Sequence, residues 1–176
     1  MSPIPTGRLI PTAEGRDLVL SRTFPAGIED VWASITESER TARWFAGWEG
    51  EAKPGATITV TMGFEDDAPR SEMLIEACEA PRHLAVRSED EYGAWHLEAH
   101  LAEQAGVTTL TLTQHLADDA APGEVGPGWE YYLDMLVASR AEQDTGTAAP
   151  TPDFDDYYPA QKAYYEGLWP STGRGC

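Results

Sequence analysis

The sequence from Ala94 to Gln143 reads AWHLEAHLAEQAGVTTLTLTQHLADDAAPGEVGPGWEYYLDMLVASRAEQ. Its first half holds two segments, residues 94–103 and 107–116, in which apolar and polar side chains alternate. This period of two predicts antiparallel strands with one dry and one solvated face. Its second half predicts a long helix that starts near Pro127. Glu130, Asp134 and Glu142 lie outside its apolar stripe. The stripe is formed by Trp129, Tyr132, Leu133, Leu136, Val137 and Arg140.

The same alternation continues upstream of this stretch. It predicts further strands over residues 56–64, 70–79 and 83–88, and residues 17–24 predict another because they are rich in strand-forming side chains and end before Pro25. Between the first two strands along the chain, apolar spacing predicts a helix over residues 28–35, and Thr36 with Glu39 has the spacing of a capping box that would start a second short helix. Because strands and helices do not alternate regularly along the chain, we expect an α+β architecture with the last helix on the dry face of an antiparallel sheet.

The two ends of the chain differ from this central part. Residues 1–15 carry three prolines and two glycines and predict a loose N-terminal arm, followed by one domain over residues 16–143. Residues 144–176 form an acidic, tyrosine-rich extension in which we expect a short helix over residues 159–168. We expect its aromatic side chains to be buried over a cavity mouth or across a homodimer interface, namely Tyr157, Tyr158, Tyr164, Tyr165 and Trp169.

Composition excludes several classes of partner. The chain has 176 residues, 30 of them acidic and 12 basic, and a formal net charge of −18. That charge opposes binding to nucleic acids and to anionic lipid surfaces. The two cysteines, Cys78 and Cys176, do not suggest a disulfide framework. Neither a signal-peptide pattern nor an apolar run of about 20 residues is present, so we expect a cytoplasmic protein without membrane insertion.

Several motifs, taken in order, resemble the START-like superfamily, which is also called SRPBCC or helix-grip. Within it, they resemble the branch of proteins similar to the C-terminal domain of the heat-shock-protein-90 ATPase activator. The motifs cover most of residues 17–143 and are Arg22–Ala26 with Val31 and Trp32, Thr41–Phe45, Glu79–Leu84, Thr108–Thr113, and Gly128 with Trp129. The resemblance implies a helix-grip fold, in which a curved sheet of six to seven strands, one of them near residues 48–52, wraps the C-terminal helix around a cavity.

Large apolar side chains are the candidates for the lining of that cavity. If sheet and helix do not close completely, they would surround a pocket in the usual ligand range of roughly 300–1,000 Å³; otherwise they fill the core. The candidate lining consists of Trp44, Phe45, Met62, Phe64, Met73, Trp95, Leu112, Gln114, Trp129, Tyr132, Leu133 and Leu136.

Three functions follow from this reading. The first is binding of a small apolar or amphipathic ligand, as in the lipid carriers and polyketide cyclases of the superfamily. The second is a chaperone-regulating module of the stress response, or another protein-interaction module. The third is a cyclase or hydrolase acting on a hydrophobic substrate. The sequence predicts no catalytic residue, because no nucleophile-elbow pattern is present and Cys78 is interpreted as a small buried hydrophobe.

A few polar side chains are candidates for metal ligands or for internal ion-pair partners. His96, Glu98 and His100 share one strand face, but neighbours two apart on a strand are about 6.8 Å distant, too far to share an ion without a residue such as His115. A solvated strand face is therefore expected, with no metal and no cofactor. By strand parity Arg22 and Gln114 point inward. An arginine in an apolar cavity would suit a carboxylate ligand, but we expect Arg22 to pair with a structural acid.

Overall fold

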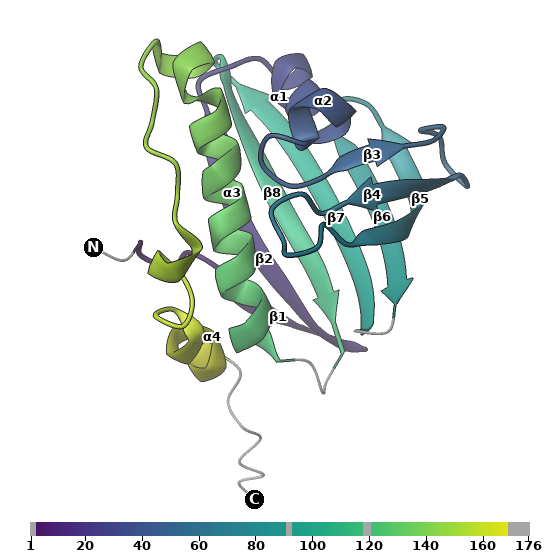
Figure 1. Ribbon diagram of the computed structural model, residues 1–176, viewed down its shortest axis with the longest axis vertical. Coiled ribbons are helices and arrows are strands. Elements are labelled where there is room, and N and C mark those ends of the chain that lie inside the picture. The colour runs from purple at the N-terminus through teal and green to yellow at the C-terminus, as the bar shows by residue number, and fades with distance from the viewer. Residues whose placement is uncertain (1–2, 91–92, 118–120, 169–176) are drawn as a thin grey trace, which may run out of the picture.

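The computed structural model describes residues 3–90, 93–117 and 121–168. It forms one curved antiparallel sheet with the strand order β1-β2-β8-β7-β6-β5-β4-β3, and the long helix α3 lies across one face (Figure 1). The strands are β1 Arg8–Thr12, β2 Gly15–Phe24, β3 Gly47–Glu49, β4 Thr57–Thr61, β5 Arg70–Glu79, β6 His83–Asp90, β7 Gly93–Gln104 and β8 Val107–Leu116. The helices are α1 Ile28–Thr36, α2 Ser38–Thr41, α3 Pro122–Thr145, the 3₁₀ turn η1 Phe154–Asp156, and α4 Lys162–Leu168.

This architecture confirms the predicted α+β helix-grip fold, with one strand more than expected. The prediction of a loose arm over residues 1–15 is wrong for residues 8–12, which form β1 and pair with β2 from Arg8↔Val19 to Thr12↔Gly15. Pro11 is tolerated there because β1 is an edge strand and one of its sides needs no ladder hydrogen bonds. The half-buried Leu9 packs against the main core and holds the strand in place.

The connection between the two short helices also differs from the prediction. The capping box is absent, because α1 continues through Thr36, whose hydroxyl donates to the carbonyl of Trp32 (2.7 Å). The corner is instead fixed by Ser38, whose Oγ donates to the carbonyl of Trp48 (2.7 Å) and accepts from its amide (2.8 Å). These two bonds hold β3, the short strand that the family resemblance implied, against α2.

Helix α3 begins at Pro122, more than one turn before the predicted start near Pro127. Pro127 lies inside the helix, where proline normally costs a backbone hydrogen bond. Tertiary packing overrides this cost because the early turns are buried under the C-terminal extension, where Gly123 and Gly126 allow α4 to approach closely. The far end follows a common rule, since Gly146 caps the helix in the left-handed conformation.

Two glycines of α3 should respond to alanine with opposite signs. A Cβ at Gly126 would lie 2.5 Å from ring atoms of Tyr165, so Gly126→Ala should destabilise the protein by about 1–3 kcal/mol through overpacking. A Cβ at Gly128 meets nothing within 4 Å, so Gly128→Ala should stabilise the helix by about 0.5–1 kcal/mol. Urea denaturation of both variants measures the difference, and equal effects would contradict the packing of α4 on α3.

The C-terminal extension docks on α3 of its own chain, on the side away from β3–β6 (Figure 1). Tyr157 and Tyr165 are buried and Tyr158 is partly buried, as predicted, whereas Tyr164 is 40% exposed, which corrects the prediction for that residue. Trp169 lies outside the described residues. The extension therefore covers the outer side of the helix, and the homodimer stays a prediction that the single chain does not test.

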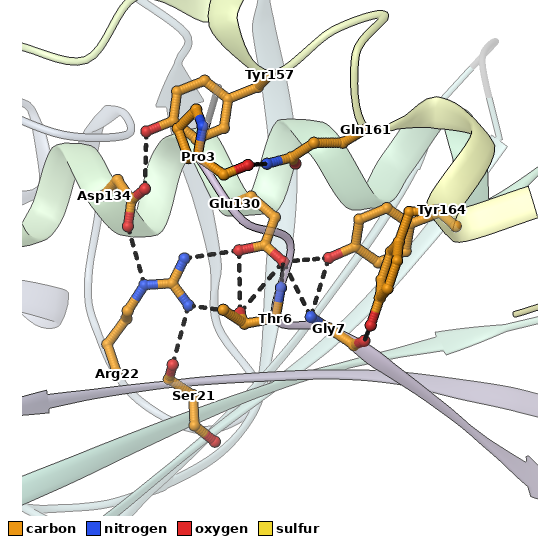
Figure 2. A network of polar contacts seen from close by, with 11 residues as sticks. Pro3, Thr6, Gly7, Ser21, Arg22, Glu130, Asp134, Tyr157, Gln161 and Tyr164 are labelled. Carbon is orange, nitrogen blue, oxygen red and sulfur yellow. Dashed lines mark hydrogen bonds and ion pairs between the residues drawn. The ribbon is translucent and has the colours of Figure 1, made fainter. Parts of the chain in front are cut away.

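A polar network centred on Glu130 joins the extension, the N-terminal segment and the sheet (Figure 2). Glu130 was expected outside the helix stripe, but its side chain is only 1% exposed. It accepts hydrogen bonds from the amides of Thr6 and Gly7, from the Tyr165 hydroxyl, and from Arg22 at 2.7 Å. Burial raises the pKa of Glu130, but these hydrogen bonds outweigh that effect and leave the pKa below its usual value.

Arg22 is the second centre of this network. It reaches Asp134 as well as Glu130, with Nε 3.0 Å from the Asp134 carboxylate, which confirms the expectation that this inward arginine pairs with structural acids. Tyr157 donates to the other oxygen of Asp134 at 2.7 Å. Each acid on this side of α3 is therefore matched by a donor from another part of the chain.

The predicted helix stripe needs two further corrections. Val137 is 36% exposed rather than buried. Arg140 is buried, as the stripe requires, but through ion pairs with Asp30 of α1 (2.7 Å) and Asp144 (2.8 Å). The predicted stripe is thus apolar where α3 faces the sheet. At its end, where α3 meets α1, Arg140 forms ion pairs instead of apolar contacts.

Candidate ligand-binding cavity

The buried apolar residues form two clusters with a cavity between them. The larger cluster joins α3 and α1 to β2, β7 and β8. The smaller contains Ala46 of the loop between α2 and β3, with Ile58, Val60, Met73 and Ile75 of β4 and β5. Figure 1 shows α3 along β2 and β8, whereas α1 and α2 lie at one end of the sheet beside β3. The cavity between the clusters measures about 150 Å³. It reaches the surface at Ala52, which is exposed.

Apolar side chains from most elements of the domain form the lining. Helix α3 contributes Trp129 and Leu133, and the loop after α2 contributes Trp44, Phe45 and Ala46. The remaining apolar lining consists of Ile35, Trp48, Ala52, Ile58, Val60, Met73, Ile75, Leu84, Val86, Leu97, Ala99, Leu110 and Leu112.

The three tryptophans of the lining have no hydrogen-bond donor left for a ligand. The indole of Trp44 donates to the carbonyl of Ser34 (2.9 Å), and that of Trp48 donates to the carbonyl of Thr36 (2.9 Å). The indole of Trp129 donates to the buried amide of Gln114 at 2.6 Å. Since an indole has a single N–H, these rings offer a ligand only apolar surface and π-faces.

Phe45 stands at the centre of an aromatic group beside the cavity. Its ring centroid lies 5.6 Å from those of Trp44 and Trp129, and 5.2 Å from that of Tyr132 in an edge-to-face arrangement. The Tyr132 hydroxyl donates to Glu65 at 3.2 Å. Burial and the nearby carboxylate raise the pKa of Tyr132, so this phenol stays neutral.

Two ionisable residues belong to the lining, Cys78 and Glu98. The carboxylate of Glu98 is bound to His83 and His115 and therefore points to the opposite, outer face of the sheet. Cys78 enters the lining because the register of β5 against β6 shifts between Ile75 and Ala77. Regular alternation from Met73 and Ile75 would instead place Ala77 on the inner face, and a bulge reverses that parity.

The structure brings some of the predicted lining residues together and places others elsewhere. Trp44, Phe45, Met73, Leu112, Trp129 and Leu133 line the cavity. Gln114 lies behind Trp129, Leu136 is fully buried in the main core, and Tyr132 packs beside Phe45. Met62 is partly buried against the smaller cluster and Trp95 is half-buried on β7, outside the lining. Phe64 is 44% exposed. β4 ends at Thr61, so Phe64 lies outside the strand and the alternation of strand faces does not apply to it.

The medium-sized aliphatic residues of β4–β8 were missed as lining residues. Ile58, Val60, Leu84 and Val86 all lie on the inner face, and strand alternation could have identified them. The prediction favoured aromatic side chains, yet the cavity wall opposite α3 is mostly aliphatic.

A sheet that wraps a long C-terminal helix above an apolar cavity defines a helix-grip protein of the START-like class. A family model described as "Activator of Hsp90 ATPase homolog 1-like protein" matches residues 25–139, and the chain belongs to this family. This confirms the resemblance found in the sequence. Among the described residues, no helix combines the length and hydropathy needed to cross a bilayer.

Solved structures share the fold over almost the whole chain. CalU16 from Micromonospora echinospora is 23% identical with a TM-score of 0.70, covering 94% of this chain and 96% of that one. The protein encoded by gene BPP1335 of Bordetella parapertussis is 26% identical with a TM-score of 0.67, covering 98% and 95%. EF2215 from Enterococcus faecalis, a conserved protein of unknown function, is 20% identical with a TM-score of 0.68, covering 93% and 88%. The search of curated proteins finds no match.

Proposed function

We propose that this protein binds a small apolar molecule in the cavity between α3 and the β4–β8 face. The observation that carries the proposal is an apolar space of about 150 Å³ between the two buried clusters of the core. An unfilled space of this size costs packing energy, and a protein interior normally avoids it. A ligand that fills the space would recover the lost contacts.

The size and chemistry of the cavity limit the ligand. An apolar cavity of about 150 Å³ can hold a molecule the size of benzene, and this one is smaller than the roughly 300–1,000 Å³ typical of drug-sized ligands. We therefore infer that a single ring or a short branched chain enters, while any larger or polar part stays at the mouth near Ala52. The inserted part carries no hydrogen-bonding group, because the indole donors of the lining already have partners.

A pair of alanine-to-leucine variants on β7 tests this proposal. Ala99 lines the cavity, so Ala99→Leu should fill part of it and weaken the binding of benzene or toluene at least about tenfold, since small apolar ligands bind by filling such space. Ala102 is exposed on the same strand, and Ala102→Leu should leave the affinity unchanged. Chemical shifts of the three cavity indole N–H groups report binding. Equal affinities for both variants, or no shift with either ligand, would refute the proposal.

The family description supports a second candidate, regulation of a chaperone ATPase. The description names an activator of the Hsp90 ATPase, and the matched residues 25–139 include the whole cavity-forming part of the chain. This candidate predicts that the purified protein accelerates ATP hydrolysis by Hsp90. An unchanged ATPase rate at saturating protein would exclude it and would leave the ligand-binding proposal untouched.

An acid–base enzyme receives less support from the cavity. General acid–base catalysis needs a titratable group within hydrogen-bond reach of the substrate. Of the two ionisable lining residues, Glu98 is directed to the outer face, which leaves the thiol of Cys78 without a neighbouring base in the lining.

A further inference from the structure

All four histidines of the chain lie on the outer face of the sheet, opposite to α3. His96 and His100 alternate on β7 with the buried Leu97 and Leu101, which fixes their outward direction. The β6–β7 register places His83 directly opposite His100, and the ring of His115 on β8 lies 4.6 Å from that of His96. Three strands thus contribute imidazoles to one surface.

Two of these histidines converge with a glutamate on the same face. Ligand atoms of His83, Glu98 and His100 all lie within 4.8 Å of one another. Nε2 of His83 is 2.8 Å from Oε1 of Glu98, and the rings of His83 and His100 stack with centroids 4.4 Å apart. Glu98 and His100 are two apart on β7, but their ligand atoms converge with that of His83 from the neighbouring strand, so the backbone spacing does not separate this group.

The carboxylate of Glu98 is held in place from its other side. Its Oε2 lies 2.6 Å from Nε2 of His115, and Nδ1 of His115 lies 2.6 Å from a carboxylate oxygen of Asp17 on β2. This chain orients Oε1 of Glu98 towards His83. Metal sites commonly have such outer partners, which fix the ligands before the ion arrives.

We propose that His83, Glu98 and His100 bind one divalent transition-metal ion of the Zn²⁺ type, with the remaining coordination position open to solvent. Two imidazole nitrogens and one carboxylate oxygen suit Zn²⁺, Ni²⁺ or Cu²⁺, whereas Mg²⁺ and Ca²⁺ require oxygen ligands throughout. Zn–N bonds of about 2.0–2.1 Å place ligand atoms about 3.3 Å apart. His100 is exposed, so its side chain has room to rotate towards this spacing. The net charge of −18 raises the cation concentration near the surface.

Zinc titration of the untagged protein by calorimetry tests this site. One equivalent of Zn²⁺ should bind, and His100→Ala and His83→Ala should each weaken the affinity at least about tenfold, because each removes one of three ligands. His96→Ala is the matched control, since His96 shares strand and face with His100 but pairs with Glu76 (2.9 Å) outside the group. Its affinity should stay at the wild-type value. His115→Ala should weaken binding about tenfold through loss of orientation.

Several results would overturn the proposal. These are an absence of saturable Zn²⁺ binding, equal losses in His96→Ala and His100→Ala, or Mg²⁺ binding as tight as that of Zn²⁺, which would indicate a diffuse acidic surface. Thermal melts establish that each variant is folded. If His83→Ala fails to fold, the exposed His100→Ala still decides the question, because its ring supports no core contact.

Discussion

Replacing Glu130 with alanine should lower the free energy of unfolding by about 3–5 kcal/mol, the usual cost of removing one partner from a buried ion pair. Glu130 is only 1% exposed, and its carboxylate is the shared acceptor for Arg22, Tyr165 and two amides of the N-terminal segment. The variant removes this shared acceptor and leaves Asp134 as the remaining ion-pair partner of the Arg22 guanidinium. Urea denaturation at pH 7 measures the loss.

Two controls are available for this experiment, a substitution of a second glutamate and the pH dependence of stability. Glu142 is exposed on the same helix, so Glu142→Ala should change stability by no more than about 0.5 kcal/mol. The pKa of Glu130 is lowered in the folded protein, so its stabilisation is complete above the unfolded pKa of about 4.3 and is lost as the pH falls through the folded pKa. The gap between the wild type and Glu130→Ala should therefore narrow below about pH 4. A gap that is constant down to pH 2 would contradict the charge-based explanation.

Tyr165→Ala should destabilise the protein by a similar amount, about 3–5 kcal/mol, as large-to-small aromatic substitutions in a core do. Tyr165 is fully buried between α4, α3 and Gly7, and its hydroxyl donates to Glu130. The loss of stability has two causes, the cavity left by the ring and the hydrogen bond that the Glu130 carboxylate no longer accepts. Denaturant unfolding and limited proteolysis beyond Asp144 should both report it, because the variant releases the extension from α3.

The neighbouring tyrosine gives the matched control. Tyr164 is 40% exposed and donates one hydrogen bond to the carbonyl of Gly7 (2.9 Å). Its replacement by alanine should cost only about 1 kcal/mol, the net contribution of a single hydrogen bond. If both variants lose the same small amount, the extension does not dock on α3 in solution, and the Glu130 network would have to be reconsidered.

The C-terminal extension adds a layer of contacts on the outer side of α3. In the described residues, the first and last segments of the chain meet on the outer side of α3, where Gln161 donates to the carbonyl of Pro3 (2.9 Å) and Tyr164 reaches Gly7. The cavity lies on the other side of the same helix. The two chain ends therefore hold α3 from the side opposite to the cavity.

Local patterns were sufficient for the order and type of most elements. Alternation over residues 94–103 and 107–116 predicted β7 and β8, and helical spacing after Pro127 predicted most of α3, because each pattern repeats with the period of its backbone and one face must be dry. The inward direction of Trp129, Leu133 and Leu112 follows from the same rule. So does the pairing of Arg22 with an acid, since a buried arginine needs a partner of opposite charge.

Features that depend on contacts between distant segments were decided only by the tertiary structure. Glu130 looked solvent-exposed on its helix, and only the docking of Thr6, Gly7 and Tyr165 buries it. His83 and His100 belong to separate strands, and only the β6–β7 register places them face to face. Strand and helix periods describe one element at a time, so register, bulges and the docking of the two chain ends are set by long-range packing that no local pattern contains.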